Sequence, residues 1–488
     1  MKMTKTEILS SNKANPLIIK LAILLFAFFI AISSAYAAEK DEFVDDFGED
    51  ETSLGFQTIF SGFIEIENFI HNYRYEEPGD ANKKNEFRAK LSLQLGTENT
   101  YFKIVPNFYA LPAFGSNKYP DYVYAELDPG DKYTVARNGR ISGKYYEASF
   151  NECYVNLGFD FIKFRLGNQI YAWGTADLYN PTSYINPSDT RELFYKDADE
   201  SKPGVPSVSA MVFISDFTLE LVYIPVHTGS ISPVPGNFWR YHYNLSFIEL
   251  QGNEDTELPV AKQNMGYAAR LSSTFGGVDI SISGYRGPDT SPLLRPMAWI
   301  GLTSDVEVEQ EYHISNNAGI DFSFSLGDFE LHGEAAYSPD KYGVVDEEYG
   351  SSLGDEDLVL LPFRIRTSGY YSYAAGFNYT HGKLIFTAEW VQSKYTDKEL
   401  MAPFYSDIIG SSISYSLFEE LINLSLIGAY HIKNHGYILS PAVSFEFDNG
   451  LSFKLSYGYI GAEESDEPNM FTLYEMKKIF IVGVRYVF

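Results

Sequence analysis

Cysteine, tryptophan and positive charge are all scarce in this sequence of 488 residues. The single cysteine, Cys153, excludes a framework of disulfide bonds. Lys and Arg together number 37 against 65 Asp and Glu, so the formal net charge is −28. A chain this acidic would repel the phosphate backbone of nucleic acids, and nucleic-acid binding is therefore excluded as a function.

Long apolar runs are also absent, except for one near the start. The run from Leu21 to Ile32 has about 12 residues, whereas a helix that crosses a membrane needs about 20. Four Lys residues precede the run and Ala35-Tyr36-Ala37 follows it, which is the pattern of a secretory signal with its cleavage site. We predict a signal peptide over residues 1–37; an N-terminal membrane anchor is the alternative.

Catalytic signatures are missing as well. The eight His residues show no His-Glu-x-x-His spacing, and the chain has no Gly-x-Ser-x-Gly elbow or phosphate loop. The acidic runs 346–348 and 355–357 are interpreted as solvated loops rather than Ca²⁺ or Mg²⁺ sites. We predict no enzymatic activity, no cofactor and no metal site.

The composition divides the exported part of the chain in two. Residues 39–51 hold eight acids and one Lys with few apolar side chains, so we predict an acidic disordered leader over residues 38–55. From residue 56 to residue 488 the composition is even and no Pro/Ser-rich linker divides it. This part is predicted to be one domain.

The domain is rich in aromatic residues, with 38 Tyr and 37 Phe in the chain, and in segments where apolar and polar residues alternate. In 87–95 every odd position is apolar, and 329–335, 384–390 and 451–457 repeat the pattern, with one exception at Ile385. We expect strands near 57–70, 86–96, 100–110, 146–157, 161–172, 207–215, 217–225, 264–275, 277–286, 314–326, 329–337, 370–381, 383–392, 410–417, 421–430, 438–447, 450–460 and 478–488.

The connections between these strands alternate in length. Short turns such as 96–99, 276–277 and 448–450 alternate with long polar stretches such as 111–145, 173–206 and 226–263. Alternating short and long connections are typical of an outer-membrane barrel, which we predict to be an all-β, up-and-down, antiparallel transmembrane barrel of about 18 strands, with 16 as the alternative. A soluble β-sandwich also alternates but does not require this pattern of connections.

The last strand carries a separate clue. Phe480, Val482, Val484, Tyr486 and Phe488 are apolar at alternate positions. They resemble the terminal strand signal by which the bacterial outer-membrane assembly machinery recognises barrels. We therefore expect insertion into the lipid of a bacterial outer membrane.

Lumen-facing charges can be assigned strand by strand if the apolar face meets lipid. We predict a basic wall of Arg88, Lys90, Lys103, Lys163, Arg165 and Arg270, and an acidic wall of Asp279, Glu330, Glu334, Glu389 and Glu446. Opposed walls would impose a transverse field that filters solutes by charge. Local pairing of these charges inside a plugged barrel is the alternative, and Glu65, Glu67, Lys454 and Arg485 do not follow the division.

The densest motif leaves the fifth predicted strand and opens a long loop. Its residues are Gly167, Gln169, Trp173, Gly174 and Asp177, followed by Asn186, Pro187, Asp189 and Arg191. The pattern Gly-x-Gln-x-x-x-Trp-Gly-x-x-Asp with a later Asn-Pro-x-Asp resembles that of porin-like outer-membrane proteins related to alginate-export-type barrels. This resemblance covers about 40 residues and implies a diffusion channel or a solute-selective channel. Loop 173–206 either folds inward and narrows the pore or caps one edge of the barrel.

Together these features predict an outer-membrane, porin-like channel for passive diffusion of small hydrophilic solutes. A plugged barrel that acts as an adhesin or receptor through its long acidic loops is the alternative. The sequence leaves open the solute, the pore diameter and the oligomeric state.

Overall fold

The structure is a computed structural model that describes residues 55–72, 82–111, 124, 127, 130–136, 139–192, 200–231, 249–252, 265–297, 305–345, 364–400, 403, 406–433, 435–462, 471 and 478–488. The predicted signal peptide, nearly all of the predicted leader, and the acidic runs 346–348 and 355–357 lie outside these residues. No helix among the described residues is long and apolar enough to cross a membrane.

Eighteen long strands form the wall of a barrel. They are β1 (Gln57–Asn72), β2 (Asn82–Gly96), β3 (Thr100–Ala110), β6 (Tyr146–Gly158), β7 (Ile162–Gln169), β8 (Val205–Ile214), β9 (Phe217–Ile224), β11 (Gly266–Phe275), β12 (Val278–Pro288), β15 (Ile314–Leu326), β16 (Phe329–Val344), β17 (Ile365–His381), β18 (Leu384–Tyr395), β19 (Ile408–Leu417), β20 (Ile422–His431), β21 (Tyr437–Glu446), β22 (Leu451–Gly461) and β23 (Lys478–Val487).

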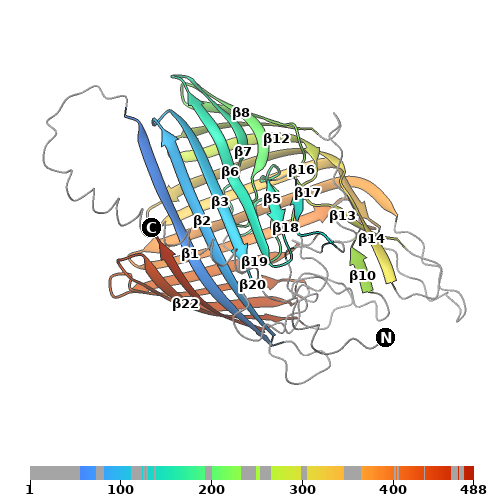
Figure 1. Ribbon diagram of the computed structural model, residues 1–488. Coiled ribbons are helices and arrows are strands. Elements are labelled where there is room, and N and C mark those ends of the chain that lie inside the picture. Colours follow the sequence, from blue (N-terminus) through green and yellow to red (C-terminus); the bar gives the residue numbers. More distant parts are fainter. Residues whose placement is uncertain are drawn as a thin grey trace, which may run out of the picture.

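Each wall strand pairs antiparallel with the wall strands before and after it in the chain, and β1 pairs with β23 to close the sheet. Figure 1 shows this closure, with β1 beside the red strands of the C-terminal end. Closure leaves no unpaired sheet edge, which is the condition for a sheet to span hydrocarbon. The predicted 18-strand up-and-down barrel is confirmed, and the alternative of 16 strands is wrong.

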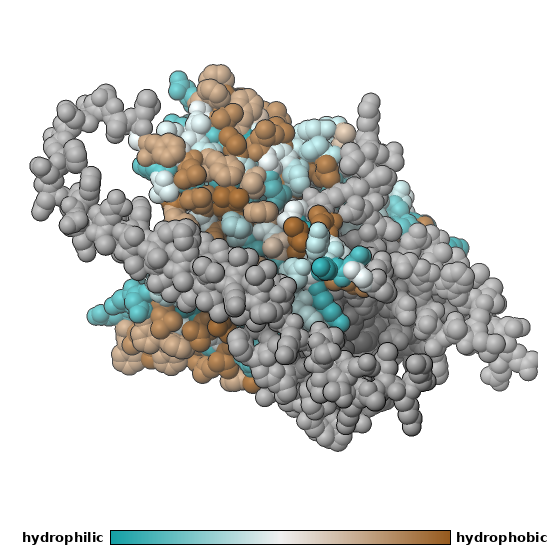
Figure 2. All heavy atoms as spheres, in the orientation of Figure 1, coloured by the Kyte–Doolittle hydropathy of each residue, from teal (hydrophilic) through white to brown (hydrophobic). Residues whose placement is uncertain are grey.

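The outside of the wall is apolar because alternate side chains face away from the lumen. On β20, Leu424 and Leu426 are 43% and 41% exposed, and neighbouring strands present Ile413 and Phe453 in the same way. Figure 2 shows hydrophobic side chains spread over the visible outer surface of the wall. Exposed Tyr267, Tyr337, Tyr371 and Tyr430 add aromatic rings, as at a membrane interface. The protein is an outer-membrane β-barrel.

Connections in the structure follow the predicted alternation. β11 and β12 are joined by Gly276-Gly277 and β15 and β16 by Gly327-Asp328, whereas the next connections on the other end are much longer. Three strands extend by four residues or more past the predicted bounds at that longer end, one of them β2, which begins at Asn82. β16 continues to Val344 and β17 begins at Ile365, because their ladder carries on past a bulge between Ser338 and Lys341.

Five short strands lie outside the ring of wall strands. The hairpin of β4 (Thr134–Ala136) and β5 (Arg140–Ser142) pairs with the start of β6. β10 (Glu249–Gly252), β14 (Asp305–Glu311) and β13 (Leu293–Met297) form a small separate sheet, which lies at one end of the barrel in Figure 1. These additions leave the lumen to be shaped by the connection between β7 and β8.

Candidate functional site

The chain turns into the lumen after β7. We call residues 170–204, which join β7 to β8, the inward loop, and describe it for 170–192 and 200–204. Gln169, at the end of β7, donates to the Ser207 carbonyl (3.1 Å) and accepts from the Ser209 hydroxyl (3.0 Å). The Asn186 amide then ties the two limbs of the loop, accepting from the Tyr171 N–H (2.7 Å) and donating to the Pro203 carbonyl (3.0 Å). Two motif positions, Gln169 and Asn186, therefore start and brace the loop, and the neighbouring Pro187 is buried.

One side of the inward loop packs as a hydrophobic core against the wall. Tyr171, Trp173 and Ile185 are buried with the lumen-facing side chains Val205, Val222, Ile224, Ala268 and Tyr285 of β8, β9, β11 and β12. The Trp173 indole N–H donates to Glu220 of β9 at 2.8 Å. The Tyr184 hydroxyl shares a hydrogen bond of 2.7 Å with Ser283 of β12, and burial raises the pKa of Tyr184 to about 12. This side of the lumen is filled.

The tip of the inward loop is held by two carboxylates from the far wall. Glu334 of β16 accepts hydrogen bonds from the N–H groups of Thr175 (3.2 Å), Ala176 (2.8 Å) and Thr182 (2.9 Å) and from the Thr182 hydroxyl (2.6 Å). Glu389 of β18 accepts from the N–H groups of Asp177 (2.8 Å), Leu178 (3.1 Å) and Tyr179 (3.4 Å). Consecutive backbone N–H groups form a concave site for an anion, and here wall carboxylates fill it.

Gly174 is required for this tip. Its φ is +93°, and a Cβ there would lie 1.7 Å from Asn180 Oδ1 and 2.7 Å from Glu334 Oε2. Beyond the tip, the Leu178 side chain packs directly on Gly410 of β19. The loop thus crosses from β7 to the wall formed by β16, β18 and β19.

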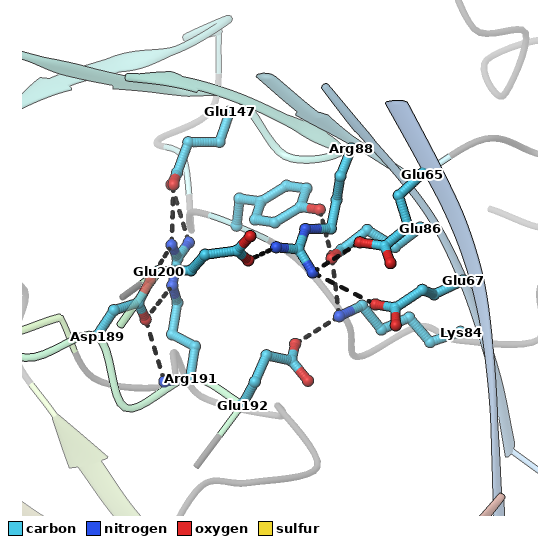
Figure 3. A network of polar contacts seen from close by, with 11 residues as sticks. Glu65, Glu67, Lys84, Glu86, Arg88, Glu147, Asp189, Arg191, Glu192 and Glu200 are labelled. Carbon is cyan, nitrogen blue, oxygen red and sulfur yellow. Dashed lines mark hydrogen bonds and ion pairs between the residues drawn. The ribbon is translucent and has the colours of Figure 1, made fainter. Parts of the chain in front are cut away.

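The returning limb is fixed by Arg191. Its guanidinium donates to both oxygens of Asp189 (2.9 and 2.7 Å) and both oxygens of Glu147 of β6 (2.9 Å each), as Figure 3 shows. Burial alone would lower the pKa of Arg191, but the two carboxylates outweigh it and hold that pKa well above its usual value. Arg191 is therefore a permanent cation that joins the loop to β6.

A second group of charges lies beside it (Figure 3). Arg88 of β2 pairs with Glu65 (3.1 Å) and Glu67 (3.5 Å) of β1 and with Glu200 of the loop. Lys84 of β2 pairs with Glu86 (2.8 Å) and with Glu192 of the loop. These side chains are all largely buried, so charge on this wall is matched locally by carboxylates.

The other residues of the predicted basic wall face the lumen, and two of them have carboxylate partners. Lys103 pairs with Glu152 (2.8 Å) and Arg270 with Asp321 (3.1 Å). Arg165 donates to Asn156 (3.2 Å), and the Lys163 ammonium lies 5.4 Å from the centre of the Phe213 ring. Lys90 is half-buried on the same face of β2. The predicted basic wall is therefore not a continuous positive surface, because carboxylates pair with part of its cations.

The predicted acidic wall divides into two groups. Glu334 and Glu389 are 4% and 2% exposed beneath the loop tip. Asp279, Glu330 and Glu446 are exposed at the end of the barrel where the turns are short. The predicted filtering of solutes by charge thus stays a prediction. Of the predicted acidic wall, only the three carboxylates at this end of the lumen are exposed.

Sequence reasoning did not single out Glu147, Glu220 or Lys84. Glu220 lies at a lumen-facing position of a predicted strand, and Lys84 continues the lumen-facing register of Glu86 and Arg88 just before another, so alternation offered a signal for both. Their partners Trp173 and Glu192 belong to a loop with no periodicity. Glu147, next to the first residue of β6, could be recognised only from its contact with Arg191.

The C-terminal residues form the seam of the barrel. Phe480, Val484 and Tyr486 are 40%, 37% and 41% exposed on the outer face, and Val482 is half-buried beside them. Phe488 exchanges two backbone hydrogen bonds of 3.0 Å with Gly62 of β1. Their role as an assembly signal stays a prediction.

Comparison with known proteins shows similarity at the level of fold alone. No protein-family model matches this chain, and no curated protein does. OccAB2 of Acinetobacter baumannii is 10% identical over 88% of this chain and 98% of that chain, with a TM-score of 0.48. OpdK of Pseudomonas aeruginosa, solved with vanillate, is 9% identical over 89% and 100%, with a TM-score of 0.48. OmpF of Salmonella typhi, in complex with daunomycin, is 9% identical over 90% and 100%, with a TM-score of 0.42. The motif resemblance to alginate-export-type barrels stays a prediction.

Proposed function

We propose that this barrel is a porin-like channel in which the inward loop forms the constriction and small hydrophilic solutes diffuse passively past it. The observation that carries the proposal is the attachment of the loop tip to Glu334 and Glu389, far from β7 in the barrel wall. A loop that only capped one edge would not need buried acceptors on the far wall.

We infer that an open path remains beside the loop. The side toward β8, β9, β11 and β12 is packed, but lumen-facing residues of β18 and β20 are exposed, including Ile385 (48%) and Ile427 (47%). Water that wets these side chains lies inside the wall, because the alternate residues Leu424 and Leu426 face lipid. Passive diffusion requires only such a water-filled path.

Removing the anchors tests the constriction. Hydrogen bonds to charged groups are worth about 1.5–3 kcal/mol each, so Glu334→Gln/Glu389→Gln should free the loop tip. In planar bilayers we expect discrete conductance steps from the unaltered protein, and larger, noisier steps from the double variant. Glu419→Gln/Glu420→Gln removes two exposed carboxylates from the turn after β19 and should leave the steps unchanged.

Two results would contradict the proposal. Identical steps from the anchor variant and the unaltered protein would show that the loop does not limit the current. A folded, heat-modifiable barrel without any conductance would overturn the channel itself and favour a plugged barrel with a surface-binding role.

A further inference from the structure

The open side of the lumen is lined by small hydroxyl side chains. On β19, β20 and β21, Ser412, Ser414, Ser425 and Ser440 occupy lumen-facing positions and are half-buried. Their registers place them together, since Ser414 is opposite Ser425 and both Ser412 and Ser440 are opposite Ile427. Residues directly opposite in antiparallel strands have Cβ atoms about 4.5–5.5 Å apart. We call these four residues the hydroxyl patch.

The hydroxyls of the patch are available to a solute. Among the described residues, none of the four makes a hydrogen bond to another protein group, whereas Ser416 and Ser444 on the same face bond to Asn423 (2.5 Å) and Glu446 (3.2 Å). Each hydroxyl offers one donor and two acceptors. Four such hydroxyls on neighbouring strands can form hydrogen bonds with a molecule that itself carries several hydroxyls.

Two apolar side chains interrupt the polar lumen face at the patch. Ile385 is opposite Ser414 and Ile427 lies between Ser412 and Ser440, and both remain nearly half exposed. Elsewhere on β19, β20 and β21 the exposed large aliphatic residues face lipid, and the lumen-facing Ile408 and Ile438 are buried. Exposed apolar area between hydroxyls matches a ring that presents C–H groups on its face and hydroxyls at its edge.

Charge is weak around the patch. Glu389, the nearest acid on β18, is covered by three N–H groups of the loop tip. Lys454 and Glu446 lie on the same face toward the short turns and have opposite signs. The path therefore offers little attraction to an ion of either sign.

We propose that the hydroxyl patch selects uncharged polyhydroxylated solutes, of the size and chemistry of a monosaccharide or polyol. This proposal rests on the proposed channel function and names the substrate class of that channel. The serines exchange hydrogen bonds with the solute hydroxyls while Ile385 and Ile427 contact its C–H face.

Swelling of proteoliposomes tests the solute class. Glucose, its carboxylate derivative glucuronate and its amino derivative glucosamine keep the same ring and have similar sizes. We expect glucose to enter about threefold faster than either ion. Ser425→Ala/Ser440→Ala removes two free hydroxyls and should abolish most of that advantage. Ser411→Ala changes the adjacent residue of β19, on the face away from the lumen, and should retain it.

The outcomes separate the two proposals. If both ions enter as fast as glucose, or if the double variant keeps the advantage of glucose, the hydroxyl-patch proposal is overturned while the channel stands. If the folded barrel gives neither swelling nor conductance, the channel proposal fails and the substrate class with it. Heat-modifiable migration in gels verifies that each variant is folded.

Discussion

Individual buried charges hold the inward loop in place. Arg191 is 7% exposed and its guanidinium is paired on two sides, with Asp189 on its own limb and Glu147 on β6. Bidentate pairs of this kind fix orientation as well as distance. A buried pair contributes little relative to apolar residues, but removal of one partner leaves the other charges without compensation.

Replacing Arg191 tests how much its buried ion pairs stabilise the protein. Arg191→Met keeps the length of the side chain but removes the cation between Asp189 and Glu147, and of the described cations Glu147 then has only Arg140, at 3.6 Å. We expect a loss of about 3–5 kcal/mol in the free energy of unfolding. Tryptophan fluorescence during denaturant unfolding measures it, because Trp173 lies in the same loop.

Arg366→Met is the matched control. Arg366 pairs with Asp397 (2.9 Å) and Glu399 (2.6 Å), but its side chain is 43% exposed, so the loss should stay below about 1 kcal/mol. Equal losses from the two variants would show that burial of the Arg191 pairs does not matter.

Among the elements, β7 is the one that directs the chain into the lumen. It ends at Gln169, three residues earlier than the alternation predicted, because the chain turns inward there. Gly167, two residues before the end, has φ +132°, and a Cβ would lie 2.2 Å from the carbonyl oxygen of Cys153 on β6. The close approach of β6 and β7 at this point depends on the missing side chain.

Gly167→Ala should therefore weaken the β6–β7 ladder. We expect a loss of about 2–4 kcal/mol in the free energy of unfolding, from both backbone strain and the clash with Cys153. Gly284→Ala in β12 is the control, since the nearest atom to its Cβ, Asn317 O, is 3.6 Å away. A Gly167→Ala barrel as stable as the control would show that the strand can shift without cost.

The whole molecule is closed by one seam between its first and last strands. β1 and β23 pair from Phe63↔Val487 to Asn72↔Lys478, and Phe488 extends the seam to Gly62. The Phe488 ring lies 5.5 Å from that of Phe60, on the strand it closes against. The residue that closes the seam is therefore also the last residue of the predicted assembly signal.

Phe488→Ser separates these two roles. The backbone bonds to Gly62 remain, so we expect refolding into lipid vesicles to persist with a loss of about 1–2 kcal/mol from the missing ring. In cells, the fraction in the outer membrane should fall much further if Phe488 is part of an assembly signal. Phe447→Ser, another exposed aromatic change near the short turns, should not have this effect. Equal levels of the two variants in the outer membrane would contradict the assembly role.

Local pattern was sufficient to predict the wall of this barrel. Lipid on one face and water or loop on the other impose a period of two on every strand, so β15 was predicted with its exact bounds, and β3 likewise. The same alternation identified the lumen face of β16 and β18, and with it Glu334 and Glu389. Strand ends were less predictable where pairing continues past the membrane, as in β16 and β17.

The contacts of those lumen-facing residues were decided only by the tertiary structure. Glu334 accepts from Ala176, 158 positions away in the chain, and Glu389 from Asp177, 212 positions away. No local pattern carries such a pairing, because it depends on where an aperiodic loop crosses a closed barrel. For the same reason, alternation predicted that Arg88, Arg270 and Glu334 face inward, but only the tertiary structure determined that they are paired or covered.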